Sequence, residues 1–483
     1  MNRRLLMNVL GKILLIEAGA MALSLAVSLY YRDGDTPAFV KTILLLLLFG
    51  LPMWRLSKPI NRDMRAREGF VAVGSAWVLL GFFGSLPFVF SGLIPDPVDA
   101  VFECVSGFTT TGASVLNDFP KDSHRGVFFW RSFTHWIGGM GVLVLTLAIL
   151  PTMSGRTAHL ARAESPGPSL ARLVPKMGNT AKLLYLIYTV LTLALTGLLM
   201  LAGMDLYDAV IHAFGTAGTG GFSNYGASVG AFSSPLIDGI ITVFMLVFGV
   251  NFALYYKLIR GSLKEAVKSE ELRVYLIIAV SAILLITVNL MPVYGNFFQA
   301  LRYGGFHAAS IMSTTGYVTA DFNLWPQFSR VMLVLLMFVG ASAGSTGGGI
   351  KVARAILLGK LGLRQIRQTF QPRKVKVVRL EGKAVEEDML GQVAVFFFAY
   401  VLLLLLGTLV ISLDNKYDLE TNFTAVLSCI SNIGPGLGAV GPVGNFSGYG
   451  SFSKIVLSLI MLAGRLELFP IFVLFHPAVW KRQ

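Results

Sequence analysis

Charged residues are scarce in this chain of 483 residues: only 14% are Asp, Glu, Lys or Arg, whereas 54% are hydrophobic. Soluble domains carry about 25% charged residues, so this balance excludes an ordinary set of soluble domains. Cysteine is also nearly absent, because Cys104 and Cys429 are the only two. They stand far apart in apolar segments without metal-like spacing, which predicts packing residues rather than a disulfide or a metal site. The hydrophobic surface must therefore meet lipid.

Motifs of two enzyme classes are also missing. No GxxxxGK[ST] stretch that would bind nucleotide phosphates occurs, and GSTGGGIK (344–351) does not match that pattern. No His and Glu residues stand at a metal-binding spacing on a helix. We therefore expect a protein that is not an enzyme and that holds no covalent cofactor.

Long hydrophobic runs are abundant instead. A helix needs about 20 apolar residues to cross a bilayer, and many runs reach that length. The sequence predicts ten helices, near 5–31, 37–57, 70–92, 127–151, 181–204, 235–259, 273–293, 329–357, 390–414 and 450–478. Ten crossings return the chain to the side on which it began.

The net charge of +14 follows these crossings rather than one basic face. Most of the 40 Lys and Arg residues fall near the N-terminus, in 55–67, 152–182, 257–273 and 351–383, or at Lys481 and Arg482. These are alternate connections, as the positive-inside rule requires of a multi-pass protein with both termini in the cytoplasm. The basic charge therefore reports membrane topology, and no nucleic acid partner is expected.

Four outward-facing connections share one internal order, in which two or three apolar helical turns run into Ser, Thr and Gly residues. They read VFECVSGFTTTGAS (101–114), VIHAFGTAGTGGFS (210–223), GFHAASIMSTTGYV (305–318) and NFTAVLSCISNIGPG (422–436). Their matched glycines are Gly112, Gly220, Gly316 and Gly434, separated by 108, 96 and 118 residues. Such a period is the signature of repeated structural units.

The sequence thus predicts an all-α integral membrane protein with four pseudo-symmetric repeats around one pore. Each repeat holds a helix, a half-helix with a filter loop, and a second helix. The four repeats are expected at 69–152, 181–260, 273–358 and 389–479. Residues 1–68 form an added N-terminal two-helix hairpin.

Non-helical backbone at membrane depth is tolerated only where protein or a water-filled cavity satisfies its carbonyl and amide groups. Four such loops would pool carbonyl oxygens that can replace the hydration shell of K+, and glycine permits the φ values that aim them. The expected filter residues are Thr110, Thr111, Gly112, Thr219, Gly220, Thr314, Thr315, Gly316, Asn432, Ile433 and Gly434. K+ itself is expected at Thr111, Gly112, Thr219, Gly220, Thr315, Gly316, Ile433 and Gly434.

None of these filter positions is charged. A Ca2+-selective pore would be expected to carry an Asp or Glu ring, and an anion pore a Lys or Arg ring. The negative dipole ends of the half-helices would further favour a cation. The alternative is that small residues merely permit close helix packing, but packing gives no reason for the same order to recur four times.

With these loops, the sequence resembles the superfamily of K+ transporters that comprises the bacterial TrkH and KtrB proteins and their plant and fungal relatives. The similarity covers nearly the whole chain, and the N-terminal hairpin and length are more similar to TrkH. The resemblance implies K+ and Rb+ uptake across the bacterial inner membrane, a homodimer, and a cytoplasmic TrkA-like ring of nucleotide-binding regulatory subunits. In relatives that prefer Na+ the first-repeat glycine can be a serine, and Gly112 here favours K+.

The eighth predicted helix is interrupted by the glycine-rich stretch GASAGSTGGGIK (340–351), which cannot remain a regular helix in lipid. We expect a loop beneath the filter that obstructs ion passage when closed, as the resemblance also implies. A glycine-mediated helix crossing is the alternative. The expected gate residues are Gly340, Gly344, Ser345, Thr346, Gly347, Gly348, Gly349, Lys351 and Arg465.

Arg465 stands near the middle of the last predicted span, where an unpaired charge is costly. Two roles are open: a positive barrier under the filter, or a structural pair with Glu467 or another carboxylate. On a regular helix, Glu467 is too close in sequence to face it. The basic stretch from Lys351 to Lys383 could bind acidic lipid headgroups or dock a regulatory subunit.

Two alternative functions remain at this point. A symporter coupled to H+ or Na+ would need a buried carboxylate relay, for which Glu17 and Glu467 are the candidates within the spans. A channel-like subunit of a pump would need a separate ATPase partner. His212 and His307 lie in half-helices and are expected to be hydrogen-bonded packing residues, and Asp205 and Asp208 to mark the start of the second half-helix.

Overall fold

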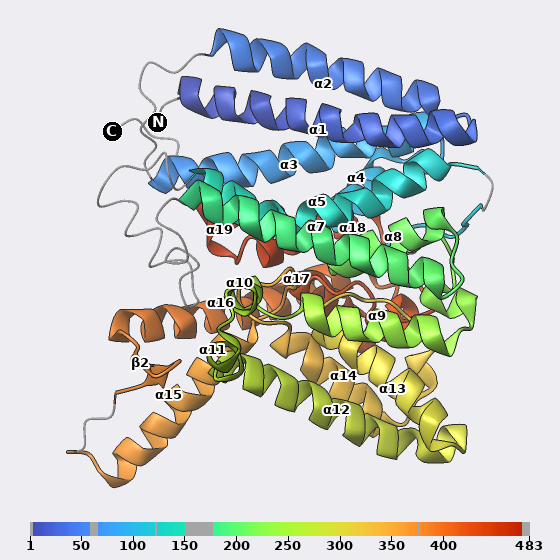
Figure 1. Cartoon of the computed structure of the whole chain (residues 1–483). Helices are drawn as coiled ribbons and strands as arrows, with labels where there is room; N and C mark the ends of the chain where they lie inside the picture. Colours follow the sequence, from blue (N-terminus) through green and yellow to red (C-terminus); the bar gives the residue numbers. More distant parts are fainter. Residues whose placement is uncertain (1–2, 58–65, 121–122, 150–176, 374–376, 476–483) are drawn as a thin grey trace.

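The computed structural model describes residues 3–57, 66–120, 123–149, 177–373 and 377–475, and its regular structure is almost entirely helical (Figure 1). The exception is a small antiparallel hairpin of β1 (Arg379–Leu380) and β2 (Lys383–Ala384). Six described helices are long and apolar enough to cross a membrane, or seven if the bent pair α9 and α10 counts as one span. The predicted all-α membrane fold is confirmed.

The first two helices form a hairpin, α1 (Arg3–Tyr31) and α2 (Thr36–Leu56), at one edge of the bundle in Figure 1. α1 also packs against α3 and α5, so the hairpin is attached to the first of the later units.

The remaining elements follow one order four times. The first helices are α3 (Ala66–Ser91), α7 (Met177–Leu201), α12 (Glu270–Tyr294) and α16 (Glu387–Ile411). The half-helices are α4 (Pro97–Phe108), α8 (Leu206–Ala217), α13 (Phe297–Met312) and α17 (Leu419–Ser431). The second helices begin as α5 (Arg125–Ile149), α9 (Pro235–Phe248), α14 (Gln327–Val339) and α18 (Ser451–Arg465). Short helices in the connections are η3 (Ser228–Phe232), α11 (Leu263–Val267), η4 (Phe322–Leu324), η5 (Ser412–Asp414) and η6 (Gly438–Val440).

Each half-helix begins with an Asp or Asn side chain that accepts a hydrogen bond from an otherwise unpaired backbone N–H of the first turn. The donors are Val98 N to Asp96 (2.8 Å), Asp208 N to Asp205 (3.1 Å), Phe298 N to Asn296 (2.8 Å) and Thr421 N to Asp418 (3.0 Å). The Thr421 hydroxyl and N–H also lower the pKa of the Asp418 carboxyl. The predicted start of the second half-helix at Asp205 is confirmed.

Within the described residues, three of the four second helices are broken. α9 bends by 92° into α10 (Phe252–Ile259), α14 is followed after 340–351 by α15 (Val352–Phe370), and α18 is followed by α19 (Phe469–Phe475). The interruption at 340–351 was predicted and is confirmed.

The continuous helices predicted over 235–259 and 450–478 were wrong. Gly249 ends α9, and Asn251 caps α10 by accepting a hydrogen bond from Ala253 N (2.9 Å). Glu467 and Leu468 have φ of 58° and 68°, which is left-handed backbone that an α-helix cannot contain. Arg465 is therefore the last residue of α18 rather than mid-helix.

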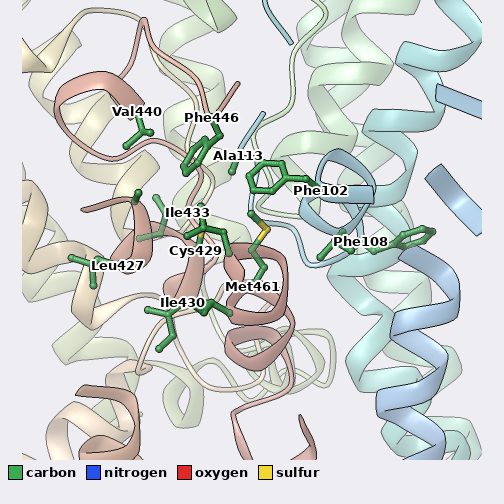
Figure 2. Packing of buried hydrophobic residues seen from close by; sticks show 14 of the residues in the cluster. Phe102, Phe108, Ala113, Leu427, Cys429, Ile430, Ile433, Val440, Phe446 and Met461 are labelled. Carbon is green, nitrogen blue, oxygen red and sulfur yellow. The ribbon is translucent and has the colours of Figure 1, made fainter. Parts of the chain in front are cut away.

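The buried core joins the first repeated unit to the last. Figure 2 shows Phe102 of α4 beside Phe446, which precedes α18, and their ring centroids lie 5.5 Å apart. Cys104 and Cys429 are both buried in the same cluster, which confirms the predicted packing role. Contact between the first and the last unit is what a closed ring of four requires.

One end of the bundle carries α15, the β hairpin and the start of α1, and the half-helix α8 begins at the other end (Figure 1). α15 carries several of the basic residues of 351–383. The predicted ends of the first and last units at 152 and 479, and the basic residues of 152–176, Lys481 and Arg482, lie outside the described residues.

Candidate ion pathway

The four loops that follow the half-helices have the same backbone conformation. Each begins with a left-handed residue of φ between 55° and 60°, namely Thr110, Thr219, Thr314 and Asn432. Two residues later stands a glycine with positive φ: Gly112 (80°), Gly221 (74°), Gly316 (81°) and Gly434 (101°). The residue between them donates its N–H to the carbonyl five residues earlier, over 2.8 to 3.0 Å; these residues are Thr111, Gly220, Thr315 and Ile433.

This conformation corrects the predicted match in the second loop. Gly220 occupies the middle position, like Thr111, and its φ is not positive, whereas Gly221 occupies the glycine position. Gly220 and Gly221 are adjacent in the sequence, so spacing alone could not show which one matches the glycines of the other loops. The equivalent glycines are therefore Gly112, Gly221, Gly316 and Gly434.

The loops contact one another in cyclic order. A Cβ placed on Gly112 would lie 2.0 Å from the Gly220 carbonyl oxygen, and one on Gly221 would lie 2.1 Å from that of Thr315. A Cβ on Gly316 would lie 1.9 Å from the Ile433 oxygen, and one on Gly434 would lie 2.7 Å from that of Thr111. Each glycine thus packs against a carbonyl of the next loop, and the last loop packs against the first. Both the positive φ and the lack of space require glycine at these positions.

The four glycines also line one cavity of about 180 Å3, together with residues that follow them in the chain, such as Ala113, Phe222, Val318 and Pro435. This cavity lies on the side of the loops where the chain continues after each glycine. The four loops therefore meet at the floor of a single vestibule.

Hydrogen bonds between small polar side chains stabilise the loops. Thr109 and Thr111 share a hydroxyl hydrogen bond of 2.8 Å, and Ser313 and Thr315 share one of 2.7 Å. Asn432 Nδ2 joins the fourth loop to the first by donating to Thr111 Oγ1 (3.0 Å). The predicted filter residues other than glycine are fully buried.

The 340–351 loop, predicted as a gate, is bound to the bend between α9 and α10. Ser342 N donates to the Gly249 carbonyl (3.0 Å), Phe252 N donates to the Gly344 carbonyl (3.1 Å), and Thr346 Oγ1 donates to the Phe248 carbonyl (3.3 Å). These contacts make the loop an ordered element rather than a simple connection.

The same loop touches the ends of two half-helices. Gly348 N donates to Thr314 Oγ1 (2.8 Å). A Cβ on Gly348 would lie 2.3 Å from the Ser431 carbonyl oxygen, and one on Gly347 would lie 2.9 Å from that of Ser313. Ser313 caps the C-terminal end of the third half-helix and Ser431 ends the fourth, so the loop lies immediately behind the predicted filter residues, on the side away from the vestibule.

Arg465 fixes this loop to α5. Its Nη1 donates to the Thr346 carbonyl (2.7 Å), and its Nη2 donates to the carbonyls of Gly138 (2.7 Å) and Gly139 (3.0 Å). The side chain is buried. Arg465 makes no ion pair with Glu467 among the described residues, so the suggested structural pair of these two residues is wrong.

Glu467 instead holds the far end of the loop. Arg354 Nη2 donates to Glu467 Oε2 (2.5 Å), and Lys351 Nζ lies 3.6 Å from Glu467 Oε1. The break after α18 turns this carboxylate toward the start of α15. Of the two carboxylates suggested for a symport relay, Glu467 is thus already paired.

Sequence reasoning missed Glu271, which binds the loop from a fourth direction. It lies in the first turn of α12, is buried, and accepts a hydrogen bond from Ala343 N (2.6 Å). A carboxylate at the boundary of a hydrophobic span was the available signal, but it is also typical of a solvent-exposed helix start.

The chain is similar in sequence to known proteins and in structure to a solved one. The profile of the TrkH family, described as a cation transport protein, matches residues 35–482. The Trk system potassium uptake protein TrkH of Escherichia coli K12 is 37% identical over 486 residues, covering 100% of both chains. The Trk system potassium uptake protein TrkG of the same strain is 32% identical and covers 99% of each. The crystal structure of the potassium transporter TrkH from Vibrio parahaemolyticus matches with a TM-score of 0.90 and 34% identity over 100% of both chains.

Proposed function

The chain belongs to the TrkH family of cation transport proteins, and from that premise we propose that it is a K+-selective, Rb+-permeable, channel-like uptake protein of the bacterial inner membrane. The observation that carries the proposal is the closed ring in which each filter glycine packs against a carbonyl of the next loop. The relatives described above are named as potassium uptake proteins and not as enzymes.

In this proposal, backbone carbonyl oxygens replace the hydration shell of K+. They come from the matched residues of the four loops, which are Thr110 to Gly112, Thr219 to Gly221, Thr314 to Gly316 and Asn432 to Gly434. Their side chains are uncharged, and the four half-helices point their C-terminal ends at the ring. The negative ends of these dipoles favour a cation over an anion.

The 340–351 loop is the proposed gate. It lies directly behind the filter, and its contacts with α9, α10, α12 and α18 hold it there. Ion passage requires that the loop move aside. Arg465 stabilises the obstructing position by hydrogen bonds and adds a positive charge that lowers cation occupancy beneath the filter.

Four repeats at 69–152, 181–260, 273–358 and 389–479, after an N-terminal hairpin at 1–68, are the proposed domain organisation. The protein is proposed to be a homodimer with cytoplasmic termini, regulated by a TrkA-like ring that binds nucleotides. The end that carries α15 and the β hairpin is the proposed docking side, where basic side chains also suit acidic lipid headgroups. There Lys360 is ion-paired with Glu270 at the start of α12, which joins this surface to the element that holds the gate.

The proposal is tested by ion flux into liposomes that contain the purified chain alone, with K+, Rb+ and Na+ compared and no proton gradient. Passive K+ and Rb+ flux that excludes Na+ is expected. Equal Na+ flux would contradict a K+ filter, and flux that appears only with an imposed H+ or Na+ gradient would contradict a channel-like mechanism.

Symport is the second candidate, and one observation favours it. Both carboxylate oxygens of Glu17 on α1 are buried and have no hydrogen-bond partner among the described residues. Glu17, however, lies in the added hairpin rather than in a repeat, and Glu467 is ion-paired with the side chains of Lys351 and Arg354. A proton relay through these two carboxylates therefore has little structural support.

A further inference from the structure

Glu103 is a fully buried carboxylate on α4, behind the first filter loop. Its Oε2 accepts a hydrogen bond from Val115 N (2.8 Å), and its Oε1 accepts one from Ser114 Oγ (2.8 Å). Ser114 and Val115 follow Gly112 in the chain. The carboxylate thus ties the segment after the filter to the half-helix before it.

Arg131 on α5 extends this tie to the second loop. Its Nε donates to Glu103 Oε1 (2.6 Å), and its Nη1 donates to the Ser223 carbonyl (2.9 Å). Its guanidinium carbon lies 3.4 Å from the ring centroid of Phe222, and the side chain is buried. Phe222 and Ser223 directly follow Gly221, so one ion pair spans the first two filter loops.

The other repeats make the same local tie without a charge. Eight residues before the middle filter residue, where repeat 1 has Glu103, the other repeats have His212, His307 and Ala425. His212 Nε2 bonds to Ser223 Oγ (3.0 Å), and Thr319 N donates to His307 Nε2 (3.4 Å).

In the fourth repeat a neighbouring residue makes this contact, because Thr424 Oγ1 accepts a hydrogen bond from Leu437 N (2.9 Å). Neutral side chains are therefore sufficient to tie a loop to its own half-helix. A buried ion pair is costly to desolvate, so the pair in repeat 1 requires a reason beyond the local tie. That reason is the link to the next loop, which only a long, forked donor such as arginine can provide while also bonding Glu103.

We propose that Glu103 and Arg131 are a positioning pair that fixes the first two filter loops relative to each other and thereby sets the discrimination of K+ from the smaller Na+. The inference rests on the proposed K+ filter and adds residues that do not touch the ion. The Gly112 contact with the Gly220 carbonyl lies between the same two loops. If the pair is broken, that carbonyl is free to move, and the ring can contract around Na+.

The test is the K+ to Na+ permeability ratio of Glu103→Gln in planar bilayers or liposomes. The amide can still accept a hydrogen bond from Val115 N but cannot neutralise Arg131. We expect the ratio to fall at least tenfold while K+ still permeates. The control is Asp238→Asn, which breaks the ion pair (2.6 Å) between the buried Asp238 in the first turn of α9 and the partly exposed Arg302 of α13, outside the four loops. This control should keep the ratio within twofold of the wild type.

A second variant covers the case in which Glu103→Gln does not fold. Glu103→Gln/Arg131→Met removes both buried charges, keeps the local tie and loses the link to Ser223. It should fold and should also lose selectivity. A wild-type ratio in either folded variant would overturn the inference, whereas a wild-type chain that does not prefer K+ would overturn the proposed function itself.

Discussion

At the scale of single residues, the fourth filter loop differs from the other three because Asn432 stands where they have threonine. Asparagine adopts left-handed backbone more readily than most residues, but the three threonines have the same conformation. The backbone alone therefore does not explain the asparagine. Asn432 Nδ2 donates to Thr111 Oγ1 and to the Met461 carbonyl, each over 3.0 Å. The side chain therefore joins the fourth loop to the first loop and to α18.

Replacing Asn432 by glycine keeps the left-handed backbone and removes these hydrogen bonds. We expect Asn432→Gly to lower the free energy of unfolding by about 1–3 kcal/mol and to reduce the K+ to Na+ permeability ratio. The matched control is Asn415→Gly, because Asn415 is also left-handed (φ 50°) but lies exposed after α16. Thermal unfolding in detergent provides the comparison, and equal midpoints for the two variants would contradict the bracing role.

Much of the shared structure of the four loops could be predicted at this scale. The four loops were recognisable because neutral Ser, Thr and Gly residues follow apolar half-helices at matched positions. The choice between Gly220 and Gly221 could not be made, because adjacent glycines satisfy the same spacing and only the backbone conformation separates them. Glu103 was also missed, because one acidic residue in an apolar half-helix does not reveal its partner on α5.

At the scale of elements, the 340–351 loop makes hydrogen bonds with α9, α10, α12 and α18 in addition to those within the loop. Arg465 makes hydrogen bonds to carbonyls of both the loop and α5, so it is a bridge as well as a charge. These two contributions are separable. Lysine keeps the charge but lacks the planar fork that reaches several carbonyls at once.

We expect Arg465→Ala to raise K+ flux several-fold, because both the bridge and the charge are lost. If the bridge dominates, Arg465→Lys should raise the flux nearly as much, and if the charge dominates, it should keep the flux close to the wild type. Liposome flux under a fixed K+ gradient measures both variants. Unchanged flux in Arg465→Ala would remove this residue from the account of the gate.

Glu271 makes a second anchoring contact with the 340–351 loop, from the end of the bundle where α15 and the β hairpin lie. Ser269 Oγ donates to Glu381 Oε1 in the hairpin (2.8 Å), while the Glu271 carboxylate accepts from Ala343 N. We expect Glu271→Ala to raise K+ flux and Glu271→Gln, which keeps an acceptor, to change it little. The exposed Glu265→Ala is the control, and flux that is the same in Glu271→Ala and Glu265→Ala would exclude this anchoring role.

The broken helices show where prediction from sequence stops at this scale. The break at the glycine-rich 340–351 stretch could be predicted, but the break at Leu466 to Leu468 contains neither glycine nor proline. The left-handed backbone of Glu467 and Leu468 is maintained by a tertiary contact, because the ion pairs of Glu467 with Lys351 and Arg354 exist only in the folded protein. The bend at Gly249 to Asn251 similarly depends on hydrogen bonds with the 340–351 loop.

At the scale of the whole molecule, the ring closes where the first and fourth repeats meet. The sequence predicts four units but does not specify which ones are neighbours. The structure has Phe102 against Phe446, both buried, beside the fourth filter loop (Figure 2). Phe446 N also donates to the Ser114 carbonyl (2.8 Å), which ties the segment before α18 to the first loop.

We expect Phe446→Ala to destabilise the protein by about 3–5 kcal/mol, because a buried aromatic ring is replaced by a cavity. The control is Phe452→Ala on α18, whose side chain is 57% exposed in the isolated chain and should face lipid. Thermal unfolding of the purified proteins measures the difference. A similar midpoint for both variants would show that this junction does not hold the ring together.

The central claim is that four glycines and four carbonyls form one selective ring, and the most direct test is the reversal potential of Gly221→Ser under opposed K+ and Na+ gradients. A side chain there meets the Thr315 carbonyl oxygen, with a Cβ only 2.1 Å away, whereas Gly239 on α9 has open space and Gly239→Ser is the control. We predict K+ selectivity in the wild type and in Gly239→Ser, and at least a tenfold loss of the permeability ratio in Gly221→Ser. A Gly221→Ser protein as selective as the wild type would contradict the ring.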